Sequence, residues 1–577
     1  MQRHLAVSLI GTALIMSRCS NLDSEPTASN SAAITVQPNY PAVLFNMHYA
    51  DAVSATDPGT FTSHWLVAYD NCSRSTPGVG YLQCDPNYGW IGWSVSSDIT
   101  GSTWSPNIPP PGWEQSNWIP PGSPSTGGTF LGWGGDPTIA LIGNVQSNAS
   151  LPPDGTRVLM ASLAISNLGG GSHPSDVATL LSSDGGQTWA TPRYVSTAIA
   201  GGVDVDQPQV VTNSSPPYST VIAWSSNTTS LSPPPEGWIL SIDNTTYMPG
   251  SSTAPGTWNI NSPTGNAFSA KKIMNQNNNA AIRPKIAVGS IPWTGGNGCN
   301  GGTHELIYAV WTTNPFGRVC GIQPPQSVSW NMAIFDNTAN AWAPTTYNIA
   351  NDAAWPTCVG SGPNGFDQPL ADIDNAALVT DGNIVAIAHN QSTPRGARIS
   401  LHEWSVTCSN GQLQAVPANL ALSPDPCYVA GLPSWCPQGY TGPNGPGGTN
   451  IVNDQWGPKL AFQKNNGVPY LLVTWYDTQG DPTNGNVHIN GAMNTTGITG
   501  NPFWVGTTST IFPVSVAGSS SETVPWGATL GLWWDYQGLG VDPVSHSFLA
   551  AWGGDARFVN TTANGPSGVW TARITTP

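Results

Sequence analysis

Residues 182–189 read Ser-Ser-Asp-Gly-Gly-Gln-Thr-Trp, and this order of side chains predicts a tight hairpin turn. An aspartate at 184 is placed to accept hydrogen bonds from turn amides, Gly186 tolerates a positive φ, and Trp189 fills space between strands. A near copy with one inserted residue covers 96–104, and a weaker copy covers 335–342. These turns predict antiparallel strands on both sides and an all-β chain.

A longer repeat surrounds the turns. An apolar first strand opens near a proline, a second strand ends before an aromatic residue, and a third leads to a Gly/Asn turn. The prolines near the first strands are 71 to 96 residues apart: Pro41, Pro137, Pro208, Pro284, Pro369 and Pro458. Seven units of about 78 residues fill 34–577. We therefore expect one seven-bladed β-propeller domain of four-stranded blades over 34–577, with six blades as the alternative count.

The composition agrees with this fold and excludes other classes. Only 8% of the 577 residues are charged, and the chain contains 64 Gly, 53 Pro and 26 Trp. Scarce Glu and Lys argue against coiled coils, and abundant aromatic residues argue against disorder. Because basic clusters are missing from the sequence, we expect no nucleic-acid partner. The net charge of −16 favours solubility without naming a partner.

The first 33 residues predict a targeting segment and a polar tether. Arg3 and His4 precede the apolar run Leu5 to Met16, which is too short to span a bilayer and fits a signal peptide over 1–18. Cys19 follows at once, as in a bacterial lipoprotein signal, so the alternatives are lipid attachment at Cys19 and simple secretion. We expect a secreted, cell-surface or periplasmic protein without a transmembrane span.

Eight further cysteines, an even number, predict disulfides in an exported chain. The most local pairs are Cys72 with Cys84 and Cys299 with Cys320. No Cys-x-x-Cys pair occurs, which argues against a zinc or redox motif.

With these motifs the sequence resembles the sialidase-like β-propeller superfamily, also named for its Asp-box or BNR repeats, over about residues 35–577. Besides the turns, four phrases carry the likeness: Gly135-Asp136-Pro137, Asn453-Asp454-Gln455-Trp456, Val473-Thr-Trp475-Tyr476-Asp477 and Asp535-Tyr536-Gln537-Gly538. The resemblance implies that Asp boxes lie opposite the functional mouth, so we expect no catalytic role for Asp98 and Asp184. It also implies that the loops before the first strands open onto that mouth.

The candidate site residues cluster around the first-strand openings and are mostly acidic. The predicted catalytic residues are Asp454, Asp535 and Tyr536. The predicted substrate-binding residues are Asp136, Asp206, Arg283, Asp367, Tyr476, Asp477 and Arg557. Carboxylates around one channel bind a cation such as Ca²⁺, bond sugar hydroxyls, or act as acid and base in glycoside hydrolysis. The structural alternative is that each Asp caps its own turn.

The sequence departs from a true sialidase. Sialic-acid hydrolases of the family clamp the substrate carboxylate with three Arg and pair a Tyr nucleophile with a Glu. Their early Tyr/Phe-Arg-Ile-Pro phrase is missing here, and Ile282-Arg283-Pro284 is its nearest match. The hypothesis is therefore an exported sialidase-like glycoside hydrolase acting on extracellular glycan or polysaccharide, rather than an exo-sialidase proper. The alternatives are a non-catalytic glycan- or protein-binding propeller and a polysaccharide lyase.

Further predictions concern the tryptophans, three histidines, the oligomeric state and cofactors. Five tryptophans in or near a Pro/Gly-rich stretch either stack on sugars or pack between blades: Trp90, Trp93, Trp113, Trp118 and Trp133. His304, His389 and His402 lack metal-ligand spacing and are expected to be structural. We expect a monomer that needs no cofactor, with a structural Ca²⁺ left open.

Overall fold

The structure is a computed structural model, and all regular elements of the residues it describes are strands apart from one isolated 3₁₀ position. It describes residues 34–38, 40–44, 50–56, 63–70, 91–105, 129–142, 157–167, 175–190, 193–195, 205–213, 219–226, 235–244, 247–248, 257–258, 271–273, 281–293, 295, 300–313, 326–355, 358–359, 368–369, 376–393, 396–422, 455–477, 488–494, 509–515, 537–542, 544–555 and 567–576. The predicted targeting segment and the two predicted local disulfides lie outside these residues.

Seven sheets, numbered here in chain order, hold most of the described strands, and every pairing within them is antiparallel. Sheet 1 contains β3 (Ala50–Thr56), β4 (Ser63–Asp70) and β5 (Ile91–Val95). Sheet 2 contains β6 (Thr129–Leu141), β7 (Val158–Asn167), β8 (Ser175–Ser182) and β9 (Arg193–Tyr194). Sheet 3 contains β10 (Val205–Thr212), β11 (Ser219–Ser226), β12 (Glu236–Asp243) and β15 (Lys271–Lys272). Sheet 4 contains β16 (Ile282–Trp293), β17 (Gly302–Thr312), β18 (Gln326–Asp336), β19 (Ala341–Trp342) and β20 (Tyr347–Trp355).

The remaining sheets follow the same plan. Sheet 5 contains β23 (Ala376–Asp381), β24 (Ile384–Thr393), β25 (Gly396–Ser409) and β26 (Gln412–Leu422). Sheet 6 contains β27 (Gln455–Asn465), β28 (Val468–Asp477), β29 (His488–Asn494) and β30 (Ser509–Pro513). Sheet 7 contains β31 (Gln537–Asp542), β32 (Ser547–Asp555) and β33 (Ser567–Thr575), with β1 (Thr35–Val36) and β2 (Tyr40–Leu44) paired to β33. Two-stranded ribbons join β13 (Tyr247–Met248) to β14 (Thr257–Trp258), and β21 (Cys358–Val359) to β22 (Gln368–Pro369).

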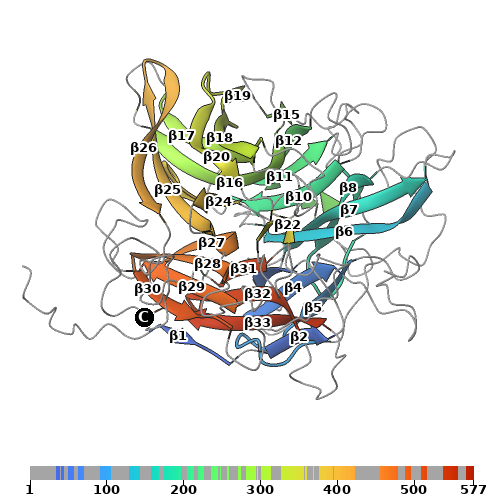
Figure 1. Cartoon of the computed structure of the whole chain (residues 1–577). Coiled ribbons are helices and arrows are strands. Elements are labelled where there is room, and N and C mark those ends of the chain that lie inside the picture. The colour runs from blue at the N-terminus through green and yellow to red at the C-terminus, as the bar shows by residue number, and fades with distance from the viewer. Residues whose placement is uncertain are drawn as a thin grey trace, which may run out of the picture.

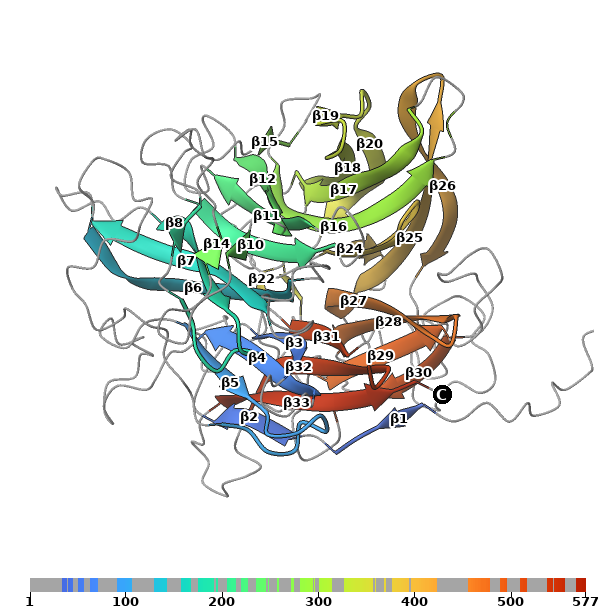
Figure 2. The same ribbon diagram turned by 180° about the vertical axis from the view of Figure 1, so that it is seen from behind.

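The sheets lie side by side around a common centre, as both views show (Figures 1 and 2). Each first strand contacts the first strand of the next sheet, in the order β3, β6, β10, β16, β23, β27 and β31, and β31 contacts β3 again. Radial repetition of small antiparallel sheets is a β-propeller, so the predicted all-β propeller is confirmed.

The number of complete blades differs from the main expectation. Six of the sheets have four or more strands, which matches the six-bladed alternative. Seven four-stranded blades are not confirmed, because sheet 1 has three strands among the residues that the structure describes.

Hydrophobic cores lie between neighbouring sheets, where flat apolar faces meet. Trp65 and Val67 of sheet 1 pack in one core with Leu549 and Ala551 of sheet 7, so the two ends of the chain are joined by burial. Pairing reinforces this closure, since β1 and β2 from the N-terminal part are hydrogen-bonded to β33. Figure 2 shows these blue strands against the red β33.

The turns at 96–104 and 182–189 have the local chemistry that their residues predict. Asp184 accepts hydrogen bonds from the Thr188 amide at 2.8 Å and from the Ser182 hydroxyl at 2.8 Å. Asp98 accepts from the Thr100 amide at 2.7 Å and the Ser102 hydroxyl at 3.0 Å. Burial raises the pKa of Asp98, but the hydrogen bonds from Thr100 and Ser102 outweigh it and the net pKa is lowered. Each carboxylate therefore serves its own turn.

Candidate functional site

The first strands of four sheets share one β-bulge. At each bulge two residues of the first strand, the second of them a proline, oppose one residue of the second strand. The pairs are Asp136-Pro137 opposite Ser162, Gln207-Pro208 opposite Trp224, Arg283-Pro284 opposite Trp311, and Gly457-Pro458 opposite Trp475.

The residue before each proline has a left-handed backbone. The φ angles are 52° at Asp136, 53° at Gln207, 52° at Arg283 and 61° at Gly457. Glycine adopts this conformation freely, whereas a side chain such as that of Gln or Arg costs about 1–2 kcal/mol there. A strained conformation repeated at four matching places is imposed by the fold, and it redirects the chain at one end of the ring. We call the end at which the first strands begin the opening face.

Three predicted site residues lie on adjacent strands of the opening face. Asp136 on β6 and Arg283 on β16 share the bulge position, and Asp206 on β10 precedes its own bulge by one residue. Strand β10 contacts both β6 and β16, so the three residues occupy one arc of the ring. Asp136 and Asp206 are half-buried, and Arg283 is buried. The Arg283 amide donates to the Ser225 hydroxyl of sheet 3 at 2.9 Å, which ties the two sheets together at the bulge.

The register also shows that these residues are not strictly equivalent from sheet to sheet. Asp206 corresponds to the residue before the bulge, and Gln207 occupies the place that Asp136 and Arg283 hold. Five of the other predicted residues lie outside the described part of the chain: Asp367, Asp454, Asp535, Tyr536 and Arg557.

Tyr476 and Asp477 are fully buried in sheet 6 rather than exposed to a channel. The Tyr476 ring stacks on Trp456, with centroids 5.7 Å apart. The Asp477 carboxylate oxygen Oδ2 accepts three hydrogen bonds from within the sheet, from Gln455 Nε2 at 3.1 Å, Trp475 Nε1 at 2.9 Å and Asn490 Nδ2 at 3.1 Å. Because buried carboxylates require such donors, Asp477 holds β27, β28 and β29 together at the opening face.

Two glutamines at the opening face were not predicted. Gln455 and Gln537 are the first residues of β27 and β31, and both are buried. The Gln537 amide nitrogen donates to the Gly457 carbonyl, and its oxygen accepts from the Thr474 hydroxyl at 3.0 Å. Their sequence signal is a glutamine within two residues of an aspartate and of a glycine, and both phrases contain it.

The tryptophans of the described chain are mainly packing residues. Trp224, Trp311, Trp475 and Trp552 are fully buried on the second strands, where they face the bulges or, in sheet 7, Gln537. Trp93 is 2% exposed and meets the ring of Trp189 edge-on at 5.4 Å. Trp133 lies on β6, and Trp90, Trp113 and Trp118 lie outside the described residues.

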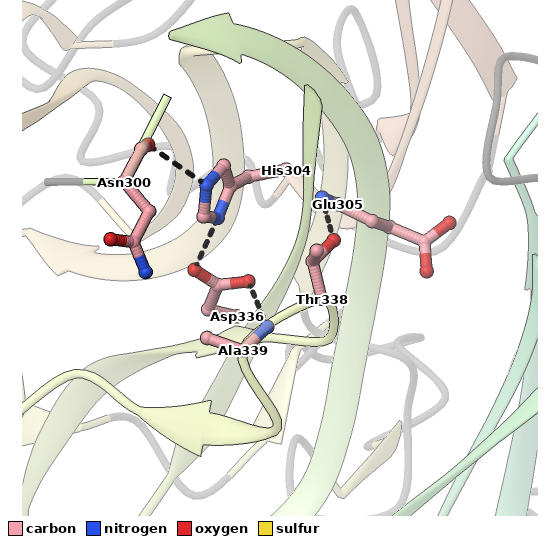
Figure 3. Close-up of polar contacts among 6 residues, drawn as sticks. All are labelled: Asn300, His304, Glu305, Asp336, Thr338 and Ala339. Carbon is pink, nitrogen blue, oxygen red and sulfur yellow. Dashed lines mark hydrogen bonds and ion pairs between the residues drawn. The ribbon is translucent and has the colours of Figure 1, made fainter. Parts of the chain in front are cut away.

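His304 is paired with Ile291 near the end of β16, away from the opening face, and its polar contacts are drawn in Figure 3. Its Nδ1 is 2.7 Å from Asp336 Oδ2, and its Nε2 is 3.2 Å from the Asn300 carbonyl. Glu305 points away from this pair in Figure 3, and its carboxylate accepts from Asn213 of sheet 3 at 2.7 Å. These contacts join strands and sheets, which agrees with a structural role for His304.

His389 and His402 form a buried pair against Trp330, whose ring centroid is 4.9 Å from that of His389. The two Nε2 atoms are 2.9 Å apart. The Asn390 carbonyl lies 2.8 Å from His389 Nδ1 and only accepts, so Nδ1 donates and His389 Nε2 accepts from His402. Burial lowers the pKa of His389 to about 3, with a further decrease from His402, and burial lowers the pKa of His402 to about 4. Both rings are neutral at physiological pH.

The described residues contain neither a metal-binding cluster nor a membrane-spanning helix. No three His, Cys, Asp or Glu side chains of this part of the chain gather as a metal site would require. Within the same residues, no helix has the length and apolar character needed to cross a membrane.

No family model and no curated protein matches the chain. Among solved structures, it is similar to the intramolecular trans-sialidase of Ruminococcus gnavus in complex with oseltamivir carboxylate, at 9% identity and a TM-score of 0.39, covering 80% of this chain and 96% of that one. It is also similar to Trypanosoma rangeli sialidase in complex with sialic acid, at 11% identity and a TM-score of 0.37, covering 80% of this chain and 57% of that one. A third is the Penicillium chrysogenum alpha-L-arabinanase complexed with arabinobiose, at 10% identity and a TM-score of 0.34, covering 79% of this chain and 97% of that one. At such identities and scores, these likenesses carry no weight for the function of this chain.

Proposed function

We propose that the protein is an exported, carbohydrate-active β-propeller, a sialidase-like glycoside hydrolase that acts on extracellular glycan. One observation carries the proposal: Asp136 and Arg283 lie at matching bulges of β6 and β16, and Asp206 lies one residue before the bulge of β10, the strand between them, so the three share one arc of the ring. Carboxylates there suit sugar hydroxyls and acid–base chemistry, and a guanidinium suits an anionic group.

The proposed roles divide along the ring. Asp454, Asp535 and Tyr536 are the proposed catalytic residues, because glycoside hydrolysis needs two carboxyl groups, roughly 5–5.5 Å apart for retention or 6.5–9.5 Å apart for inversion. Substrate contacts are assigned to the arc described above together with Asp367 and Arg557. Tyr476 stacks on Trp456 and Asp477 accepts three hydrogen bonds within sheet 6, so in this proposal they support that sheet.

Incubation with a panel of glycans and polysaccharides tests the proposal. Wild type is expected to release sugar, and Asp454→Ala and Asp535→Ala are expected to lower the rate at least about 100-fold, as loss of a positioned acid or base does. Asp381→Ala is the control, since Asp381 ends β23 away from the opening face and pairs with Lys464 at 2.8 Å.

Two other outcomes of this experiment would contradict hydrolysis and indicate a different function. Glycan binding without turnover, unchanged by the two substitutions, identifies a non-catalytic binding propeller. An unsaturated product that absorbs in the ultraviolet identifies a polysaccharide lyase.

We also propose that sheet 1 is a seventh blade and that the turns at 96–104 and 182–189 are Asp boxes of the superfamily. The contacts of β3 with β6 and with β31 support this count, because sheet 1 stands between two complete blades. The bonds of Asp98 and Asp184 to their own turns support the second point.

Export is proposed through a signal peptide over 1–18, followed by lipid attachment at Cys19 or by simple secretion. Cys408 is disulfide-bonded, which supports export because disulfides persist in oxidising compartments. The proposed protein is a monomer that acts without a cofactor, and a structural Ca²⁺ remains an open alternative.

A further inference from the structure

We propose that Gln537 is a positioning residue that couples the first strands of sheets 6 and 7 where they begin, next in sequence to the proposed catalytic residues Asp454, Asp535 and Tyr536. The inference rests on the proposed function for the identity of those segments. It rests on described residues for the coupling itself.

The nitrogen and the oxygen of the Gln537 side-chain amide both form hydrogen bonds with sheet 6. The nitrogen donates to the Gly457 carbonyl on β27, and the oxygen accepts from the Thr474 hydroxyl on β28 at 3.0 Å. A planar amide bonded to two strands is fixed in position and in orientation. Gln537 is 1% exposed and Thr474 is fully buried, so water does not replace either partner.

The accepting carbonyl belongs to the bulge that redirects β27. Gly457 has a φ of 61° and is the first residue of that bulge. On the other side of the bulge, Gln455 donates to Asp477 at 3.1 Å. The chain is therefore held from sheet 6 at residue 455 and from sheet 7 at residue 457.

This network fixes the two points from which the proposed catalytic segments depart. Asp454 precedes Gln455 by one residue, and Tyr536 and Asp535 precede Gln537 by one and two residues. When two catalytic groups belong to two different sheets, the distance between the groups must stay constant, because small misplacements lower the rate of catalysis. The Gln537 amide provides a direct link between those sheets next to both segments.

Another boundary between first strands is bridged differently and supplies a matched control. Between sheets 3 and 4, the Gln209 side-chain oxygen accepts from the Ile286 amide at 2.7 Å. Gln209→Met removes a glutamine bond between first strands at a place far in sequence from 454 and 536, whereas Gln537→Met removes one such bond and also the bond to Thr474.

Hydrogen exchange on the full chain tests the coupling without any substrate. Gln537→Met is expected to raise amide exchange at least about threefold in two peptides at once, those that contain 455–458 and 537–540. Gln209→Met is expected to leave both peptides within about 1.5-fold of wild type. The proposal is overturned if exchange in 455–458 is unchanged in Gln537→Met, or if both variants change it equally.

Kinetics then test the positioning role. On the glycan that wild type turns over, Gln537→Met is expected to lower kcat at least about 10-fold with KM within about twofold. Gln537→Glu keeps the acceptor for Thr474 but replaces the donor to the Gly457 carbonyl by an oxygen, so it is expected not to recover that loss. An unchanged kcat overturns the positioning role. Absence of turnover by wild type on every glycan refutes the proposed function alone, because the exchange experiment still decides the coupling.

Discussion

Acidification is expected to destabilise the protein through one buried pair, His389 and His402. Both pKa values are lowered in the folded state, to about 3 and about 4, from an ordinary value of 6.5. Below pH 6.5 the unfolded chain therefore binds two protons that the folded chain does not. The stabilisation is fully present above pH 6.5 and is lost progressively as the pH falls towards the folded pKa values.

The magnitude follows from the size of the pH change. At pH 5, which is 1.5 units below the pKa of a histidine in the unfolded chain, each buried ring that stays neutral lowers the free energy of unfolding by about 2 kcal/mol relative to pH 7. The pair together lowers it by about 4 kcal/mol. Burial of both rings and the 2.9 Å contact between their Nε2 atoms leave no room for two charges.

The assay compares wild type with His402→Gln by urea denaturation at pH 7 and pH 5, followed by tryptophan fluorescence. A glutamine amide still donates to His389 but does not titrate, so the variant is expected to lose about 2 kcal/mol less than wild type between the two pH values. Carboxylates that titrate in both proteins cancel in this difference. Equal losses in wild type and His402→Gln would refute the reasoning.

Three further outcomes are expected. Asp477→Ala should lower the free energy of unfolding by about 3–5 kcal/mol, because three buried donors lose their acceptor. Asp477→Asn should lower it clearly less, and equal losses in the two variants would contradict the role of Asp477 as an acceptor within sheet 6. Gly186→Ala should lower the free energy of unfolding by about 1–3 kcal/mol more than Gly467→Ala, as measured by denaturant midpoints. Both glycines have a positive φ, but only at 186 would an added Cβ lie 3.0 Å from the Leu66 side chain. Deletion of residues 1–44 removes β1 and β2 from β33 and should lower the thermal midpoint, whereas deletion of 1–33 should not; equal midpoints would show that these strands do not close the ring.

Much of the fold was predictable because turns and strand periodicity are local properties. The residues of 182–189 predict their own hairpin, and the structure shows Asp184 and Gly186 in the expected conformation and bonding. The all-β propeller likewise follows from repeated strand units, because each unit buries its faces only against a neighbour. The expectation of four strands in every blade is not confirmed for sheet 1, which has three strands among the described residues.

The candidate site was predictable only in part. Asp136, Asp206 and Arg283 were predicted at the openings of first strands, and the structure brings them onto one arc. Tyr476 and Asp477 were predicted as substrate contacts and are instead buried, because the direction of a side chain on a central strand depends on what packs against it. The sequence does not predict the role of Gln537, because a glutamine carries no charge and its partners Gly457 and Thr474 belong to another sheet.

The sequence by itself determined the fold class, the turns and the end of each strand that carries acidic residues, since these depend on neighbours in the chain. Only the tertiary structure decided which of those residues share an arc, which are buried, and which sheets are tied together. The physical reason is that the position of a carboxylate or an amide in the sequence does not set which groups it binds. What it does depends on the donors and acceptors that distant strands bring within about 3 Å of it.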